Sequence, residues 1–94
     1  MTKEEILQYL KKKNWDKDFL EKISEIVANY VVYQIDPDSY NQYSHRYYFD
    51  YDIAKKDFDN RDYVPSGSWC ICILRDLTGV KENQRRVISS KNID

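Results

Sequence analysis

Glycine and proline are scarce in this 94-residue chain, which has two of each. A glycine-rich phosphate loop would need more glycine, and a linker, repeat array or disordered tail would need more of both residues. No apolar stretch approaches the roughly eighteen residues of a membrane span, and the N-terminus lacks the basic-then-apolar order of a secretory signal. We therefore expect one compact cytoplasmic domain over residues 1–94, with no membrane partner.

Cysteine and histidine are equally scarce, since Cys70, Cys72 and His45 are the only residues of these types. Cysteines two apart on a strand point to the same face in a poor geometry for a disulfide, so we expect both thiols to be reduced and buried. No second paired motif completes a zinc site, and the sequence predicts neither metal nor cofactor. Apolar surroundings disfavour a reactive thiolate, so a Cys–His enzyme ranks third among the functional hypotheses, and we predict a protein that is not an enzyme.

Residues 69–74 (WCICIL) form the one unbroken apolar run. A short run of aromatic and β-branched residues between turn-forming residues predicts a buried strand. A second strand over residues 85–89 would complete a β hairpin over about residues 68–89. Residues 90–94 are expected to fray.

The N-terminal part predicts an antiparallel helix hairpin over about residues 3–35. Thr2 followed by Glu5 is a capping box, and Asp16 can cap a second helix. Apolar residues of the second helix recur every three or four positions, which predicts a broad buried face. They are Phe19, Leu20, Ile23, Ile26, Val27, Tyr30 and Val31.

The second helix ends before Pro37, because the residue preceding a proline is pushed out of the helical conformation. Residues 31–35 are also compatible with a strand. We expect Ile23, Val27 and Tyr30 to pack against the strand of residues 69–74.

Residues 36–63 are acidic and rich in tyrosine, with seven Asp against four basic residues. Apolar and polar side chains alternate over residues 45–53, which predicts a half-exposed strand, although tyrosines at helical spacing favour a helix instead. The sum is an α+β domain: an N-terminal antiparallel helix hairpin packed on a small, about three-stranded antiparallel sheet.

Tyrosines in a polar stretch are typical of a contact surface, because rigid amphipathic rings give contact area at low entropic cost. On the predicted strand Tyr48, Asp50 and Asp52 share the outer face. Arg85 and Arg86 are the most concentrated basic pair near the C-terminus. The candidate partner-binding residues are Tyr40, Tyr43, Tyr47, Tyr48, Asp50, Asp52, Arg85 and Arg86.

The leading hypothesis is a small binding protein that inhibits or modulates a protein partner with a basic surface. In size and composition the chain is similar to small inhibitors encoded by phages and mobile elements, including anti-CRISPR and anti-defence proteins, and to toxin-immunity proteins. That likeness implies an inhibitor that acts in the host cytoplasm. The alternative is a small nucleic-acid-binding module in which tyrosines stack on bases and arginine and lysine side chains contact the backbone. The net charge of −1 disfavours it.

Overall fold

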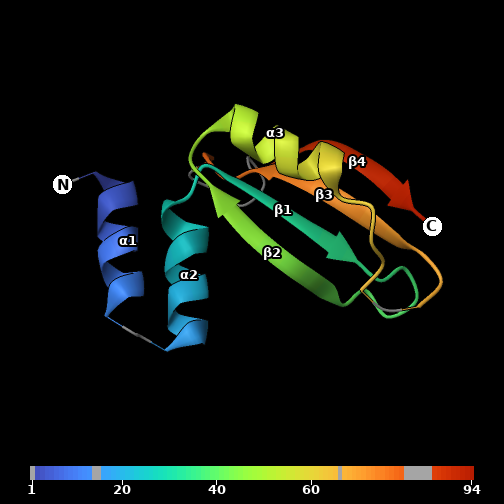
Figure 1. Ribbon diagram of the computed structural model, residues 1–94, viewed down its shortest axis with the longest axis horizontal. Coiled ribbons are helices and arrows are strands. Elements are labelled where there is room, and N and C mark those ends of the chain that lie inside the picture. The colour runs from blue at the N-terminus through green and yellow to red at the C-terminus, as the bar shows by residue number, and fades with distance from the viewer. Residues whose placement is uncertain (1, 14–15, 66, 80–85) are drawn as a thin grey trace.

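The computed structural model describes residues 2–13, 16–65, 67–79 and 86–94. Within these ranges, four strands form one antiparallel sheet in the order β2-β1-β3-β4, and three helices pack against it or stand at its end (Figure 1). The elements are α1 (Lys3–Lys12), α2 (Lys17–Val27), β1 (Tyr30–Ile35), β2 (Gln42–Tyr48), α3 (Tyr51–Asn60), β3 (Cys70–Asp76) and β4 (Val87–Ile93). The α+β class with an N-terminal helix pair is confirmed, and the sheet has four strands rather than about three. No helix in the described ranges is long and apolar enough to span a membrane.

Side-chain caps start both N-terminal helices where the sequence predicts. The Thr2 hydroxyl accepts a hydrogen bond from the Glu5 amide at 3.1 Å, as a capping box requires. The Asp16 carboxylate accepts from the amides of Asp18 at 2.9 Å and Phe19 at 3.3 Å. α1 and α2 lie side by side and antiparallel at one end of the sheet (Figure 1).

The second helix is shorter than the apolar period suggests. It ends at Val27, where Ala28 adopts an extended conformation, and β1 begins at Tyr30. β1 is a central strand that pairs with both β2 and β3. The prediction of a helix through Val31 was therefore wrong, and the strand alternative for residues 31–35 was correct, because β-branched and aromatic residues favour a pleated, buried position.

The predicted burial of the α2 apolar face was also wrong. Phe19 and Ile26 are exposed, and Ile23 and Val27 are only half-buried. The reason is the position of the helix pair, which stands at the end of the sheet, whereas α3 packs across its face (Figure 1).

The strand predicted over residues 45–53 ends at Tyr48, and the ten-residue helix α3 follows it. Asp50 caps this helix by accepting a hydrogen bond from the Asp52 amide at 2.8 Å. Ala54 and Phe58 lie four positions apart on the buried side of α3. The alternation of aromatic and acidic residues after Tyr48 therefore belongs to a helix N-terminus and not to a strand.

The predicted β hairpin is present and is longer than expected. Along β3 buried and half-buried residues alternate, so that Cys70, Cys72 and Leu74 share the face beneath α3. β4 continues to Ile93, which pairs with Cys70 and is buried. The expectation that residues 90–94 fray was wrong over most of that stretch, because Ile93 contributes to the core.

Two apolar clusters lie on opposite faces of the sheet. The larger one lies between α3 and the sheet and consists of Val32, Ala54, Phe58, Cys70, Cys72, Leu74 and Ile93. The smaller one lies on the other face and consists of Ala28, Val31, Tyr33 and Leu77. The face beneath α3 is therefore the main core.

Replacement of Leu74 with Ala is expected to lower the free energy of unfolding by about 2–5 kcal/mol, because this side chain is fully buried. Ile71→Ala should cost roughly half as much or less, since Ile71 is only half-buried and points to the opposite face. Urea denaturation of the two variants checks the order. An equal loss in both would contradict the assignment of the core to the α3 side.

Candidate functional site

The structure does not gather the tyrosines of residues 36–63 onto one strand face. Tyr48 packs against the core beneath α3, whereas Tyr47 packs against the smaller cluster on the opposite face. The prediction that Tyr48, Asp50 and Asp52 share an outer strand face was wrong, because the strand ends at Tyr48 and Asp50 caps α3. A partner-binding role for these residues stays a prediction.

Tyr48 belongs to a polar network between α3 and the sheet. Its hydroxyl donates to Asp57 Oδ2 at 2.7 Å. The Arg61 guanidinium donates to both Asp57 oxygens, with Nε and Nη2 each at 3.1 Å. The Arg61 side chain is buried, and its Nη1 donates to Gln34 Oε1 at 3.2 Å. The Asp57–Arg61 ion pair of α3 is thus hydrogen-bonded to Tyr48 in β2 and to Gln34 in β1.

Gln34 extends this network to the connection between α3 and β3. Its Nε2 donates to the Tyr63 carbonyl at 2.6 Å and lies 3.5 Å from Cys70 Sγ. Among the described residues, no buried side-chain nitrogen or oxygen lacks a hydrogen-bond partner. A fully satisfied network of this kind fixes the position of α3 on the sheet.

The charge states agree with a structural role for the ion pair. Burial raises the pKa of Asp57, but hydrogen bonds from Arg61 and Tyr48 outweigh it and hold the pKa below its usual value. Burial, followed by the neighbouring Asp57, raises the pKa of Tyr48. Asp57 is therefore ionised and Tyr48 protonated at neutral pH, as the hydrogen bond between them requires.

Tyr40 occupies an unusual position in the loop between β1 and β2. It has a positive φ of 60° and is 80% exposed. The loop backbone is held on both sides, because the Tyr40 amide donates to the Asp36 carbonyl at 2.8 Å and the Asp36 amide donates to the Asn41 carbonyl at 2.9 Å. The Asp36 carboxylate also accepts from the Asp38 amide at 3.0 Å and the Ser39 hydroxyl at 3.1 Å. The loop thus presents an aromatic ring to solvent from a fixed backbone.

Two further exposed aromatics lie at the same end of the molecule. Tyr63 is 45% and Trp69 is 36% exposed, and both lie in the connection between α3 and β3. The sheet register places this connection beside the Tyr40 loop, because Ile35 pairs with both Ile71 and Gln42. We call this end the distal loop surface, formed by residues 36–41, 61–65, 67–69 and 94.

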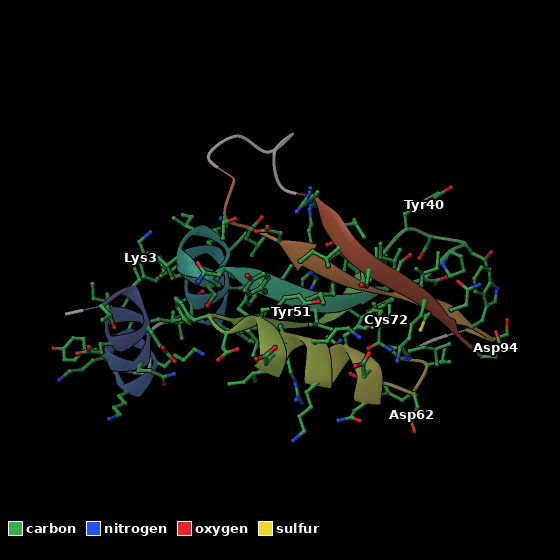
Figure 2. The ribbon with its side chains drawn as sticks, turned by 90° about the horizontal axis from the view of Figure 1, so that it is seen from above. Lys3, Tyr40, Tyr51, Asp62, Cys72 and Asp94 are labelled. Atoms are coloured by element: carbon green, nitrogen blue, oxygen red, sulfur yellow. The ribbon has the colours of Figure 1, made fainter. Side chains whose placement is uncertain are left out.

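The distal loop surface is acidic. Its charged residues in the described ranges are four Asp and Arg61, whose side chain is buried within the network. Figure 2 labels Tyr40, Asp62 and Asp94 at this end of the molecule. Asp36 and Asp38 in the Tyr40 loop complete the acidic set. Exposed aromatic rings and carboxylates therefore coincide here.

Tyr47 pairs with Val31 toward the α2 end of the sheet, whereas Tyr43 pairs with Gln34 nearer the Tyr40 loop. Tyr47 shares the sheet face of Tyr33 and His45, and Tyr43 lines a hollow between α2 and β2. Between Tyr43 and Tyr47, β2 contains one more residue than the paired stretch of β1. This β-bulge includes Ser44, which has a positive φ.

Arg86, the described member of the basic pair, is not beside the tyrosines of the distal loop surface. Arg85 lies outside the described residues. Arg86 is exposed and precedes β4, where its carbonyl accepts a hydrogen bond from the Asp76 amide at 2.9 Å. Because β4 begins opposite Arg75 and ends opposite Cys70, Arg86 lies at the far end of the sheet from Tyr40.

The Cys–His hypothesis finds no supporting geometry. His45 stacks on Tyr33 on one face of the sheet, whereas Cys70 and Cys72 are buried in the core on the other face. Burial raises the pKa of the Cys72 thiol. Within the described ranges, no group of three His, Cys, Asp or Glu side chains is placed to hold a metal ion.

Several residues of the polar network and the distal loop surface were not predicted from the sequence. Asp57 and Arg61 have the i,i+4 spacing of a helical ion pair. This pairing was not predicted, because residues 45–53 were interpreted as a strand. Trp69 was assigned to the buried run, although alternation from a buried Cys70 would have placed it outside. Tyr63 was one of the tyrosines of the acidic segment but was not selected as a candidate.

Asp57→Ala is expected to lower the free energy of unfolding by about 3 kcal/mol at neutral pH, because it leaves a buried guanidinium unpaired. The matched control is Asp59→Ala, which removes the exposed pair with Lys55 and should cost about 0.5 kcal/mol or less. Denaturant unfolding of both variants tests the difference, and equal losses would contradict a structural network.

Low pH should remove the contribution of Asp57 to the free energy of unfolding. Since its folded-state pKa is lowered, its stabilisation is complete above its usual pKa and is lost as the pH falls through the folded-state value. The stability difference between the native chain and Asp57→Ala should therefore shrink below about pH 4. A difference that stays constant from pH 7 to pH 2 would show that the carboxylate charge is not what stabilises the fold.

Comparison with known proteins provides no relative from which a function could be carried over. The chain matches no family model, no curated protein and no solved structure. The functional argument therefore depends on the side chains themselves.

Proposed function

We propose that this protein is a non-enzymatic inhibitor or modulator that binds a protein partner with a basic surface through the distal loop surface. It would act in the manner of the small phage and mobile-element inhibitors, such as anti-CRISPR proteins, to which it is similar in size and composition. The support comes from one end of the molecule where exposed aromatic rings and carboxylates coincide.

The main support for this proposal is Tyr40, which combines a positive φ with an exposed ring. A bulky residue with positive φ costs about 1–2 kcal/mol, and glycine or asparagine would adopt the same conformation more easily. The ring is 80% exposed, so packing within the protein does not account for a tyrosine at this position. A contact with a partner does account for it, because an exposed aromatic ring is a frequent binding hot spot.

The hydrogen bonds of the Tyr40 loop favour binding further. Asp36 holds the loop through its backbone and its carboxylate, so little backbone freedom remains to be lost on association. Tyr63 is held in a similar way, because its carbonyl accepts from the buried Gln34. Two of the three aromatic residues are thus preorganised.

The charge of the distal loop surface indicates the class of partner. Its exposed ionised side chains in the described ranges are carboxylates, which complement lysine and arginine on a protein. A nucleic acid could stack its bases on the same rings, but it would bring phosphates next to Asp38 and Asp62. A protein partner therefore fits better.

The variant Tyr40→Asn tests the proposal, since asparagine tolerates positive φ. We expect the free energy of unfolding to stay within about 0.5 kcal/mol of the native value or to rise. The affinity for the partner should fall by about 2 kcal/mol, or roughly thirtyfold, as for an aromatic hot spot. The measurements are denaturant unfolding and titration calorimetry with the partner recovered from the native host.

The matched control is Tyr9→Ala, which removes another exposed tyrosine from α1 at the opposite end of the molecule. It should leave the affinity unchanged. If Tyr40→Asn is less stable but binds as tightly as the native chain, Tyr40 has a structural role and the proposal fails. A partner that is released by nuclease treatment would make the nucleic-acid alternative the better one.

A further inference from the structure

A groove of about 380 Å³ lies between α2 and the sheet face opposite α3. One wall carries three carboxylates, Asp18, Glu21 and Glu25, whose spacing of three and four residues places them on the same side of α2. Tyr33, His45 and Tyr47 contribute aromatic rings from the sheet. The volume suits one side chain or a small molecule.

The three rings form a nearly parallel set. The Tyr33 and His45 ring centroids are 5.0 Å apart with planes at 9°, and those of His45 and Tyr47 are 6.3 Å apart at 16°. His45 Nε2 lies 3.0 Å from Gln42 Oε1, and Nδ1 faces Glu21 Oε1 at 3.8 Å. The groove therefore combines flat aromatic surfaces with carboxylates.

The His45 and Tyr47 side chains of the groove carry no charge at neutral pH. Burial lowers the pKa of His45 and outweighs the opposite effect of Glu21 and Glu25, so the imidazole is neutral at pH 7. Burial, followed by the same two carboxylates, raises the pKa of Tyr47 to about 12, so its phenol is neutral as well. Glu21 and Glu25 line the same groove as these rings.

We propose that this groove binds the guanidinium group of an arginine side chain in a polypeptide. A guanidinium is planar, stacks on aromatic faces and donates to two carboxylate oxygens at once, whereas an ammonium group offers only a compact point charge. Lys22 and Arg75 also line the groove, but the three carboxylates of α2 outnumber these two cations. The site is separate from the distal loop surface and does not depend on the function proposed above.

The experiment is an NMR titration of the full chain with N-acetyl-L-arginine amide, followed by N-acetyl-L-lysine amide at the same concentrations. The arginine compound should shift the resonances of Tyr33, His45 and Tyr47 in a saturable way, with a Kd of about 1 mM or tighter. The lysine compound should bind at least fivefold more weakly. Equal binding of the two compounds would overturn the guanidinium assignment, and the absence of saturable shifts would overturn the site.

Two acid-to-amide variants locate the binding. Glu25→Gln should weaken arginine binding about fivefold or more, because it removes a carboxylate from the groove wall. Glu4→Gln, an exposed carboxylate on α1, is the matched control and should leave the Kd unchanged. If both variants bind as the native chain does, or if both lose binding equally, the groove is not the site. Unchanged backbone resonances away from the substitution establish that each variant is folded.

Discussion

The buried ion pair between Asp57 and Arg61 is the interaction on which the arrangement of this small domain depends. α3 buries only two side chains, Ala54 and Phe58, so apolar contact alone stabilises the packing of this helix on the sheet only modestly. The Arg61 guanidinium adds hydrogen bonds to its own helix and to Gln34 in the central strand. Because the buried guanidinium is costly without these partners, the network favours one position of α3.

The residues of this network stabilise the fold, whereas the residues proposed to bind a partner lie outside it. α3 covers one face of the sheet, and the helix pair α1 and α2 stands at one end (Figure 1). The distal loop surface lies at the other end of the sheet. Gln34 also holds the connection that carries Tyr63, so this buried side chain links the core to the distal loop surface. The acidic residues accordingly have different roles: Asp50 caps a helix, Asp57 pairs with Arg61, and Asp36 holds the Tyr40 loop. The other acidic residues of the distal loop surface, Asp38, Asp62 and Asp94, are exposed.

Local features were predictable from the sequence and non-local ones were not. The caps at Thr2 and Asp16 depend on residues two or three positions away, and both were found. Asp50 is an equally local cap, but the alternation of aromatic and acidic residues around it was interpreted as a strand. Gln34 and Arg61 meet across 27 residues, so no periodicity indicates their contact. The positive φ of Tyr40 was not predicted either, because tyrosine rarely adopts this conformation.

The central claim is that the distal loop surface, and not the polar network, carries the contact with the partner. Amide hydrogen exchange of the free chain and of its complex with the recovered partner tests it most directly. The account predicts that binding slows exchange in residues 36–41 and 61–69 and leaves α3 unchanged. Slower exchange in α3 or in the N-terminal helices, with unchanged exchange in the Tyr40 loop, would contradict it.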